Sequence, residues 1–288
     1  MTQDRTPNLL TFDIEGFIEA SHDSMRVPRK YVSSELEREE IEVNTLAILE
    51  LLAETGQKAT FFVLGRIARD MPALVRRIVD LGHELACHSL EHRRLYAFAP
   101  REVRTFLREA KRLLEDVSGE SVRGFRAPDF SITEANLWTF DLLRETGFTY
   151  DSSVYPTSLH DAYGIGNFPR SPFRMKNGLI EFPMSTTRIL GANLPFGGGG
   201  YLRLYPLPLT RLLFRRANRA GVPVNLYLHP SEMGKVVRRI EGLGPLRRFR
   251  TYVGITRARD KLRALLRSFP FIRMTDYMDR YPIGAGAA

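Results

Sequence analysis

The stretch Gly82-His83-Glu84-Leu85-Ala86-Cys87-His88-Ser89-Leu90-Glu91-His92 decides the fold. A helix-period segment, Pro72–Leu81, precedes it, and Gly82 stands where a left-handed residue commonly ends a helix. Glu84–Cys87 is a short run typical of a buried strand, and polar residues follow it at once. A helix, a glycine, a buried strand and polar residues at the end of that strand thus follow one another. This order indicates a parallel sheet covered by helices.

The same unit recurs along the chain. The strand candidates are Leu9–Phe12, Ala59–Leu64, Glu84–Cys87, Val122–Phe125, Phe148–Tyr150, Leu179–Phe182, Val224–Leu228 and Phe271–Met274. The helical patterns are Val43–Thr55, Pro72–Leu81, Pro100–Val117, Glu134–Thr146, Leu207–Ala220 and Ile255–Ser268. This alternation predicts an α/β fold, and 288 residues are enough to close such a sheet into a barrel. We expect a single barrel domain at residues 8–235 and a basic helical C-terminal extension at 236–288 packed on it.

Composition fits a globular protein, with 43% hydrophobic and 26% charged residues. No stretch approaches the ~20 apolar residues that a membrane-spanning helix needs. The first residues do not resemble a secretory signal. A single cysteine, Cys87, excludes an internal disulfide framework and fits a reducing compartment. We therefore expect a cytoplasmic protein.

The formal net charge is +9, and many of the arginines lie beyond Thr210. One interpretation is an ordinary solvated surface. The other is attraction to anionic groups, such as the headgroups of a membrane surface or a lipid-pyrophosphate-linked sugar. We do not expect nucleic acid as a partner, because no zinc-finger spacing or stacking-aromatic motif accompanies the charge.

Two carboxylates end the first strand candidate. Asp13 and Glu15 are two residues apart, so in an extended backbone they share a face while Ile14 turns to the other. Converging carboxylates are costly unless a cation or a proton lies between them. Two incidental acids on a solvated loop are the alternative.

Two histidines follow the strand Glu84–Cys87. His88 and His92 are four residues apart, which places them on one face if a helical turn begins there and suits a shared metal. An ordinary surface helix is the alternative. We expect Glu91 to meet solvent and Cys87 to be buried.

Two further strand ends carry polar residues. Arg126, after Val122–Phe125, has the geometry to orient a carboxylate, and the turn through Asp129 can present a backbone N–H to an oxyanion. His229 ends the strand Val224–Leu228. Each signal is weak by itself, and a buried structural histidine is as common as a catalytic one.

Together these residues predict a catalytic metal site. Glu15, His88 and His92 would leave a coordination position open, as catalytic zinc sites do. Zn²⁺ suits this donor set best, and Co²⁺, Ni²⁺ or Fe²⁺ would also fit. Asp13 would serve as general base and a protonated His229 as general acid.

The motifs resemble those of the polysaccharide deacetylases (carbohydrate esterase family 4, NodB homology domain). They are Thr11-Phe12-Asp13, Lys58–Gly65, Gly82-His83-Glu84 with His88-Ser89-x-x-His92, Arg126-x-Pro128 and Leu226-x-Leu228-His229, in this order. The resemblance runs from about Leu9 to Glu232. It implies a distorted (β/α)7-type barrel with one divalent metal, and release of acetate from N-acetylated amino sugars.

The resemblance also implies roles for individual residues. Asp13 matches the catalytic base and His229 the catalytic acid, while His88 and His92 match the metal histidines. Arg126 matches the residue that orients the base, and Asp151 the acid that holds this arginine. We expect the oxyanion and the sugar to meet Asp129, Phe130, Gly199, Tyr201 and Leu228.

Two positions depart from the commonest pattern of the family. Asp13-Ile14-Glu15 replaces adjacent aspartates, and strand alternation supports Glu15 as the ligand. Asp129 stands where a tyrosine is usual, so we expect Phe130 to supply the aromatic wall. Gly197–Gly200 with Tyr201 and the basic C-terminus resemble a subgroup associated with exopolysaccharide gene clusters. His160 and Asp161 are weaker candidates for lining the substrate groove.

Three activities remain open from the sequence. The first is deacetylation of an exopolysaccharide or its lipid-linked precursor. The second keeps the barrel and the metal but cleaves a formyl group on a lipid-linked amino sugar or a small cyclic amide. The third is glycan binding without hydrolysis, which predicts the loss of a ligand or of the base.

Overall fold

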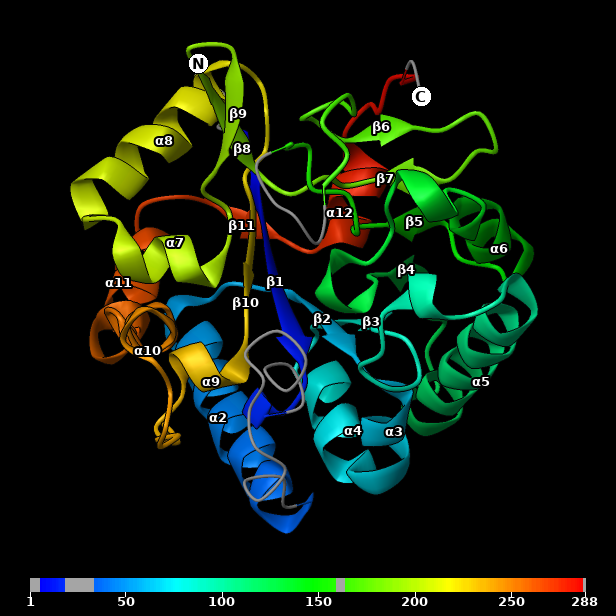
Figure 1. The fold of residues 1–288 in the computed structure, drawn as a ribbon, viewed down its shortest axis with the longest axis horizontal. Coiled ribbons are helices and arrows are strands. Elements are labelled where there is room, and N and C mark those ends of the chain that lie inside the picture. The colour runs from blue at the N-terminus through cyan, green and yellow to red at the C-terminus, as the bar shows by residue number, and fades with distance from the viewer. Residues whose placement is uncertain (1–5, 19–33, 159–163, 287–288) are drawn as a thin grey trace.

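The computed structural model describes residues 6–18, 34–158 and 164–286. Its main sheet follows the order β10-β1-β2-β3-β4-β5-β7-β6, with β11 also paired to β1 (Figure 1). Neighbouring strands are parallel except for β6 and β7, which are antiparallel. The strands are β1 (Asn8–Ile14), β2 (Thr60–Val63), β3 (Glu84–Cys87), β4 (Gly124–Phe125), β5 (Tyr150–Asp151), β6 (Phe173–Arg174), β7 (Ile180–Glu181), β10 (Asn225–Leu228) and β11 (Phe271–Ile272).

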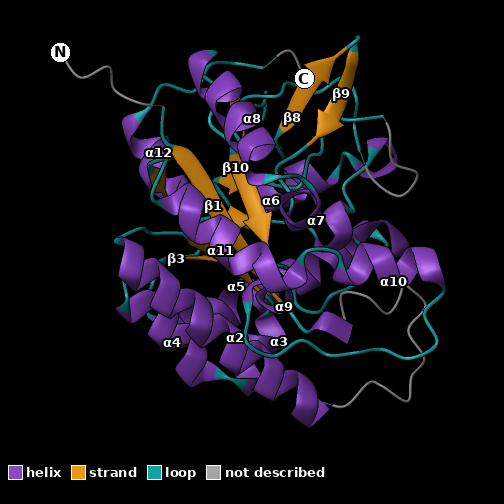
Figure 2. Ribbon diagram, turned by 90° about the vertical axis from the view of Figure 1, so that its left-hand side faces the viewer, coloured by secondary structure: helices purple, strands orange, loops and turns teal. Residues whose placement is uncertain are grey.

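The helices lie around this curved sheet (Figures 1 and 2). They are α2 (Ser34–Thr55), α3 (Gly65–Asp70), α4 (Pro72–Asp80), α5 (Pro100–Ser118), α6 (Thr139–Glu145), α7 (Gly199–Leu204), α8 (Leu207–Arg219), α9 (Pro230–Met233), α10 (Pro245–Tyr252), α11 (Ile255–Leu266) and α12 (Met274–Arg280). No helix among the described residues is long and apolar enough to cross a membrane.

Strand β1 separates the core from the site. Its apolar residues Leu10, Phe12 and Ile14 are fully buried in the main hydrophobic cluster, together with residues of α2 and α5. Because side chains alternate along a strand, Thr11 and Asp13 point to the opposite side, the interior of the curved sheet. Both contact Arg126 there.

The sheet forms a half-barrel rather than a fully hydrogen-bonded cylinder. Across the opening, the side chain of Asn225 on β10 donates to Ser152 Oγ at 3.0 Å and to the carbonyl of Phe182 at 3.1 Å. One amide side chain thus joins strand ends that are not paired through their backbones among the described residues. The α/β class and the distorted (β/α)7-type architecture expected from the sequence are confirmed.

The C-terminal segment is more than an extension packed on the barrel. Its strand β11 pairs with the start of β1, through Asn8 with Phe271 and Leu9 with Ile272. Met274 and Tyr277 of α12 are buried in a second hydrophobic cluster inside the sheet. Residues beyond 235 therefore contribute both to the sheet and to its interior.

Some elements differ from those predicted. The helix expected at Glu134–Thr146 is a 3₁₀ turn, Glu134–Asn136, followed by the shorter α6. The hairpin of β8 (Thr186–Ile189) and β9 (Ala192–Pro195) was not predicted, nor was α10. The hairpin stands at one end of the molecule beside α8 (Figures 1 and 2).

Candidate active site

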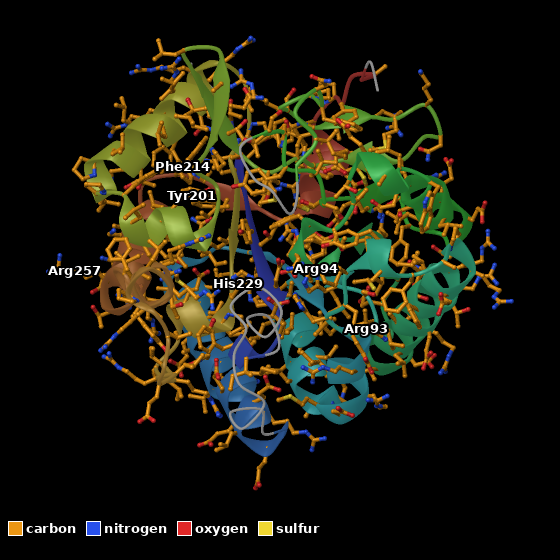
Figure 3. The ribbon with its side chains drawn as sticks, viewed as in Figure 1. Arg93, Arg94, Tyr201, Phe214, His229 and Arg257 are labelled. Carbon is orange, nitrogen blue, oxygen red and sulfur yellow. The ribbon has the colours of Figure 1, made fainter. Side chains whose placement is uncertain are left out.

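Polar side chains from neighbouring parallel strands meet at the carboxyl edge of the sheet. Strand β1 supplies Asp13 and leads into Glu15, β3 leads into His88, β4 leads into Arg126, and β10 leads into His229. Parallel α/β folds commonly place their catalytic residues at this edge. Figure 3 shows His229 near the centre of this face, with Tyr201 on one side and Arg94 on the other.

Glu15, His88 and His92 form a compact group. Each offers a ligand atom, and these atoms lie within 4.8 Å of one another. The Nε2 atoms of His88 and His92 are both 3.0 Å from Glu15 Oε2. All three residues were predicted as metal ligands, and the structure brings them together.

A loop positions the two histidines, and not the helical turn that their spacing suggested. Residues 88–92 are non-helical, and Ser89 has a positive φ of 71°. The first residues of α3 hold the loop, because Gly65 N–H donates to Ser89 and Arg66 N–H to Leu90. The prediction of a helical turn at this point was wrong.

The donor set fits a divalent metal. His88 Nδ1 lies 2.8 Å from the carbonyl oxygen of Arg126, which can only accept, so Nδ1 carries the proton. In the neutral ring, Nε2 then directs a lone pair at the carboxylate of Glu15. Such an arrangement is favourable when a cation or an additional proton lies between the two groups. One carboxylate and two imidazoles leave a coordination position open.

The charges around Glu15 keep it ionised. Burial raises the pKa of this carboxyl, but the positive charge of His92 and the contacts with His229, His88 and His92 outweigh burial. The pKa of Glu15 is therefore held well below its ordinary value. A buried, ionised carboxylate is what a cation site requires.

Arg126 is fully buried and fixes Asp13. Its Nη1 lies 2.6 Å from Asp13 Oδ1 and 2.9 Å from Thr11 Oγ1. Its Nε donates to the carbonyl of Ser152, and its Nη2 donates to Ser152 Oγ and to Met184 Sδ. The five N–H donors of the guanidinium thus have five acceptors.

Asp151 does not hold Arg126. Its carboxylate accepts from the backbone N–H and the hydroxyl of Ser153, at 3.0 and 2.7 Å, and lies beside Glu181. Burial raises the pKa of Asp151 and of Glu181, and the charge of Asp151 raises that of Glu181 further. The role predicted for Asp151 is filled by its neighbour Ser152, since all donors of Arg126 are occupied by other groups.

His229 lies between two carboxylates. Its Nε2 is 3.2 Å from Glu15 Oε1 and its Nδ1 is 3.2 Å from Glu232 Oε2. Burial lowers the pKa of His229, but hydrogen bonds with Glu15 and Glu232 outweigh burial and raise it well above its ordinary value. The imidazole is therefore held in its protonated form.

Glu232 and Arg203 support this histidine, and sequence reasoning missed both. Glu232, three residues after His229, also accepts from the backbone N–H of His229 at 3.1 Å. Arg203 on α7 donates from Nε to Glu232 Oε1 at 2.9 Å. A capping pattern, His-Pro-x-Glu, was available in the sequence, but no local signal linked Arg203 to it.

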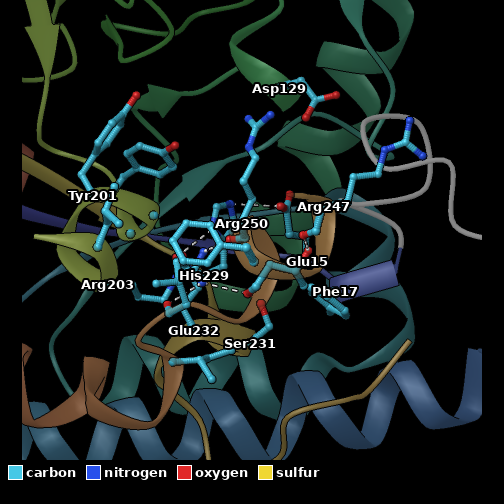
Figure 4. Close-up of a pocket in the computed structure, with 18 residues that line it drawn as sticks. Glu15, Phe17, Asp129, Tyr201, Arg203, His229, Ser231, Glu232, Arg247 and Arg250 are labelled. Atoms are coloured by element: carbon cyan, nitrogen blue, oxygen red, sulfur yellow. Dashed lines mark hydrogen bonds and ion pairs between the residues drawn. The ribbon is translucent and has the colours of Figure 1, made fainter. Parts of the chain in front are cut away.

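The site opens into a pocket of about 490 Å³, within the range of small-ligand sites (Figure 4). Asp129, Gly199 and Tyr201 line it, as predicted. Phe130 and Leu228 do not. Leu228 is fully buried in the main core. The ring centroids of Phe130 and Tyr227 are 4.9 Å apart, and only Tyr227 lines the pocket, so Tyr227 supplies the aromatic wall that we expected from Phe130.

The 3₁₀ turn Pro128–Phe130 adopts an uncommon backbone. Asp129 and Phe130 have positive φ values of 53° and 51°. Such strain at non-glycine residues is typical of functional sites. The N–H of Phe130 donates to the carbonyl of Ala127, and the side chain of Asp129 pairs with Arg94 at 2.7 Å.

Cys87 is buried and takes no part in the site. Burial raises the pKa of its thiol to about 12, so it stays protonated. Glu91 is exposed, as expected. The predicted groove residues His160 and Asp161 lie outside the described residues.

Three comparisons agree with this architecture. Residues 25–150 match the polysaccharide deacetylase family, and residues 152–279 match a domain of unknown function, DUF3473. A chitooligosaccharide deacetylase from Sinorhizobium fredii is 41% identical over 102 residues, which are 35% of this chain and 45% of that protein. The chain thus spans less than half the length of this curated relative.

Solved structures share the fold at low sequence identity. A presumed polysaccharide deacetylase from Mycobacterium smegmatis superposes with a TM-score of 0.67 at 20% identity, covering 97% of this chain and 91% of that one. An allantoinase superposes with a TM-score of 0.64 at 15% identity, covering 98% and 93%. The chain therefore carries a polysaccharide deacetylase domain (carbohydrate esterase family 4, NodB homology type) at residues 25–150, followed by DUF3473 at residues 152–279.

Proposed function

We propose that the protein is a metal-dependent hydrolase that removes N-acetyl groups from amino-sugar units of an exopolysaccharide or of its lipid-linked precursor. The observation that carries this proposal is the grouping of His88, His92 and His229 around Glu15, with Asp13 two residues before Glu15, beside the pocket that Glu15 and His229 line. Chitooligosaccharide and peptidoglycan deacetylases among the relatives support the substrate class.

Glu15, His88 and His92 would hold one divalent metal, with Zn²⁺ the best match to a carboxylate and two imidazoles. Bound there, such a metal would acidify a water molecule and polarise the acyl carbonyl. The other residues of the site would bind the substrate and transfer protons.

Asp13 accepts a proton from the attacking water. Arg126 occupies its Oδ1, which leaves Oδ2 as the accepting atom and keeps the carboxylate in one orientation. The tetrahedral oxygen of the intermediate meets the backbone N–H of Asp129, because the neighbouring N–H of Phe130 already donates to Ala127.

His229 donates a proton to the leaving nitrogen as the C–N bond breaks. Glu232 and Arg203 hold its ring, and the raised pKa of His229 keeps that proton available at neutral pH. Water and the N-acetyl group thus give acetate and a free amine.

Pocket size favours a sugar over a small cyclic amide. The cavity of about 490 Å³ is walled by Tyr201, Tyr227 and Phe249, which are suited to stacking on sugar rings. The alternative of a non-catalytic binder predicts a missing ligand or base, whereas each polar role is filled here. Similarity to an allantoinase fold at 15% identity supports the fold alone.

We also propose a cytoplasmic location and contact with an anionic membrane surface, where a lipid-linked precursor would be reached before export. Exposed Leu209 and Leu212 on α8 lie among exposed arginines, and Leu190 at the tip of the β8–β9 hairpin is fully exposed. Apolar side chains flanked by arginine suit an anionic bilayer surface. Cosedimentation with phosphatidylglycerol vesicles, and none with phosphatidylcholine vesicles, is the expected result; equal sedimentation with both would contradict it.

The decisive experiment measures acetate released from N-acetylglucosamine oligomers by Zn²⁺-loaded protein. We expect release by the wild type, and its loss in the Asp13→Asn variant and on addition of a chelator. Formate from N-formyl sugars and ring opening of allantoin are measured in parallel. Turnover of either of these without acetate release would replace the deacetylase assignment.

A further inference from the structure

Arginine side chains line the pocket opposite the proposed catalytic residues. Arg247 and Arg250 on α10 line the cavity that also contains Glu15 and His229. They are three residues apart and so lie on one face of the helix. Figure 4 shows both guanidinium groups directed to the side of the pocket where Asp129 lies. Arg248, between them in sequence, does not line the pocket.

Helix α10 is fixed relative to the site by Arg203. The same guanidinium that donates to Glu232 also donates to the carbonyls of Thr251, Val253 and Arg250, at 2.8, 3.2 and 3.3 Å. Arg203 is 9% exposed, so these bonds are shielded from water. The position of α10 is thereby coupled to that of the residue that holds His229.

The acids that line the pocket already have basic side chains as partners. Glu15 contacts three histidines, Glu232 contacts Arg203 and His229, and Asp129 pairs with Arg94. Among residues 6–18, 34–158 and 164–286, no carboxylate pairs with the side chain of Arg250. Arg250 therefore brings to the pocket a positive charge that no carboxylate of the described residues pairs with.

Tyr201 lies within electrostatic reach of Arg250. Burial and the neighbouring Tyr205 raise the pKa of the Tyr201 hydroxyl, and the positive charge of Arg250 acts in the opposite direction. A protonated phenol beside a guanidinium offers two kinds of donor to one anion.

We propose that Arg250, Arg247 and Tyr201 form an anion subsite, which binds a carboxylate or phosphate group on the sugar chain next to the N-acetylated unit. The preferred substrate is then an acidic glycan or a sugar phosphate, and not a neutral chitin-like oligomer. This inference rests on the proposed deacetylase function, because that function places the anion subsite next to the N-acetylated unit of the substrate. Its binding component is testable without turnover.

The test compares matched ligands at about 0.15 M salt, where long-range attraction is screened. The first ligand is a tetrasaccharide of alternating glucuronate and N-acetylglucosamine, and the second is its methyl ester. The third is N-acetylglucosamine carrying a phosphate at C1, with neutral N-acetylglucosamine as reference. Binding is measured by calorimetry on the Asp13→Asn variant, alone and combined with Arg250→Gln, Arg247→Gln or the control Arg248→Gln. Acetate release is measured on the same Arg→Gln variants in the wild-type background.

We expect an anionic ligand to bind at least about tenfold more tightly than its neutral counterpart, as charged hydrogen bonds permit. Arg250→Gln and Arg247→Gln should each abolish this preference and raise KM without lowering kcat. Arg248→Gln should retain the preference. The ligand that shows this preference, the uronate or the phosphate, identifies the anionic group that the subsite binds.

Equal binding of charged and neutral ligands would overturn the subsite, and so would an equal loss of preference in Arg248→Gln. If neutral oligomers release acetate without any anionic preference, the deacetylase function stands and the subsite falls. If the Arg250-dependent preference appears in binding while no ligand releases acetate, the subsite stands and the deacetylase function falls.

Discussion

Arg126 Nη1 and Asp13 Oδ1 lie 2.6 Å apart, and both side chains are almost completely shielded from water. The arginine is the largest fully buried side chain of the protein's described residues, and its acceptors lie on β1 and on the segments that follow β5 and β7. The proposed base is therefore oriented by a residue that also holds the interior of the half-barrel together. The proposed catalysis and the stability of the fold would thus depend on the same ion pair.

Replacing Arg126 with Gln should affect both properties. Removing one partner leaves the buried Asp13 carboxylate unpaired, which costs about 3–5 kcal/mol. We expect the free energy of unfolding in urea to fall by this amount and acetate release to be lost. Arg123→Gln is the control, because Arg123 is partly exposed and its 3.5 Å contact with Asp279 is worth about 1 kcal/mol or less. If the Arg126→Gln variant were as stable as the Arg123→Gln variant, this account of Arg126 would be contradicted.

Metal binding should depend on His92. Wild-type protein dialysed against Zn²⁺ should retain about one ion per chain, as one set of three ligands predicts. His92→Ala should weaken the affinity by more than about 100-fold, since losing even an outer-sphere partner costs about 10–100-fold. Glu91→Gln, an exposed neighbour in the same loop, should bind Zn²⁺ normally. Normal binding by His92→Ala would remove this residue from the ligand set.

The support of His229 can be disturbed without changing any charged residue. A Cβ atom on Gly199 would lie 1.9 Å from Glu232 Oε2, so Gly199→Ala must displace this carboxylate. We expect kcat to fall by about tenfold or more, since general acid–base catalysis contributes about 10²–10⁴-fold. Gly200→Ala is the matched control, because its nearest neighbour would be 3.9 Å away. Equal activity of the two variants would show that Glu232 does not position the acid.

His83 should make stability depend on pH. Its side chain is buried beside Lys58 and Arg273, and burial lowers its pKa to about 4, from an ordinary value of about 6.5. The unfolded chain therefore binds a proton more readily than the folded protein between these values. Stability should fall as the pH drops from about 6.5 toward 4, by about 3 kcal/mol at most.

The variant His83→Gln keeps an acceptor for the N–H of Ala59 but cannot be protonated. Urea unfolding at several pH values should give a flatter curve for this variant in that window. Carboxyls whose pKa is raised in the folded protein, such as that of Glu84, change stability with pH in the opposite direction. They are present in both proteins, so the comparison with the wild type cancels their contribution. Parallel curves for the two proteins would assign the acid sensitivity to other groups.

Sequence reasoning located the strand ends well because each carries a local signal. Buried runs ending in polar residues marked β1, β3 and β10, and the parallel alternation implied that Asp13, His88 and His229 would meet. The loop of Ser89 was missed because a histidine pair at this spacing fits a helical turn equally well. The hairpin β8–β9 was missed because Thr186–Pro195 lacks a clear apolar alternation.

Most of the residues that hold the site in place carry no local sequence signal. Ser152 and Arg203 act through contacts that depend on the tertiary arrangement, and the apolar residues of α10 stand among three arginines that also fit a solvated basic segment. Asp151 was assigned to Arg126 on the resemblance. Strand alternation, applied to β5, points Asp151 and Ser152 to opposite sides, which is where the structure places them.

The pairing of β1 with both β10 and β11 has a consequence for the order of folding. Strand β1 leaves the ribosome long before two of its three partners, β10 and β11, have been made. Until then its carboxyl-bearing end is assembled without His229, and an apolar edge stays unpaired, which is a known route to aggregation. High contact order of this kind slows folding. A chain truncated before Phe271 would thus emerge with the residues of the proposed site present and the edge of β1 that pairs with β11 still exposed.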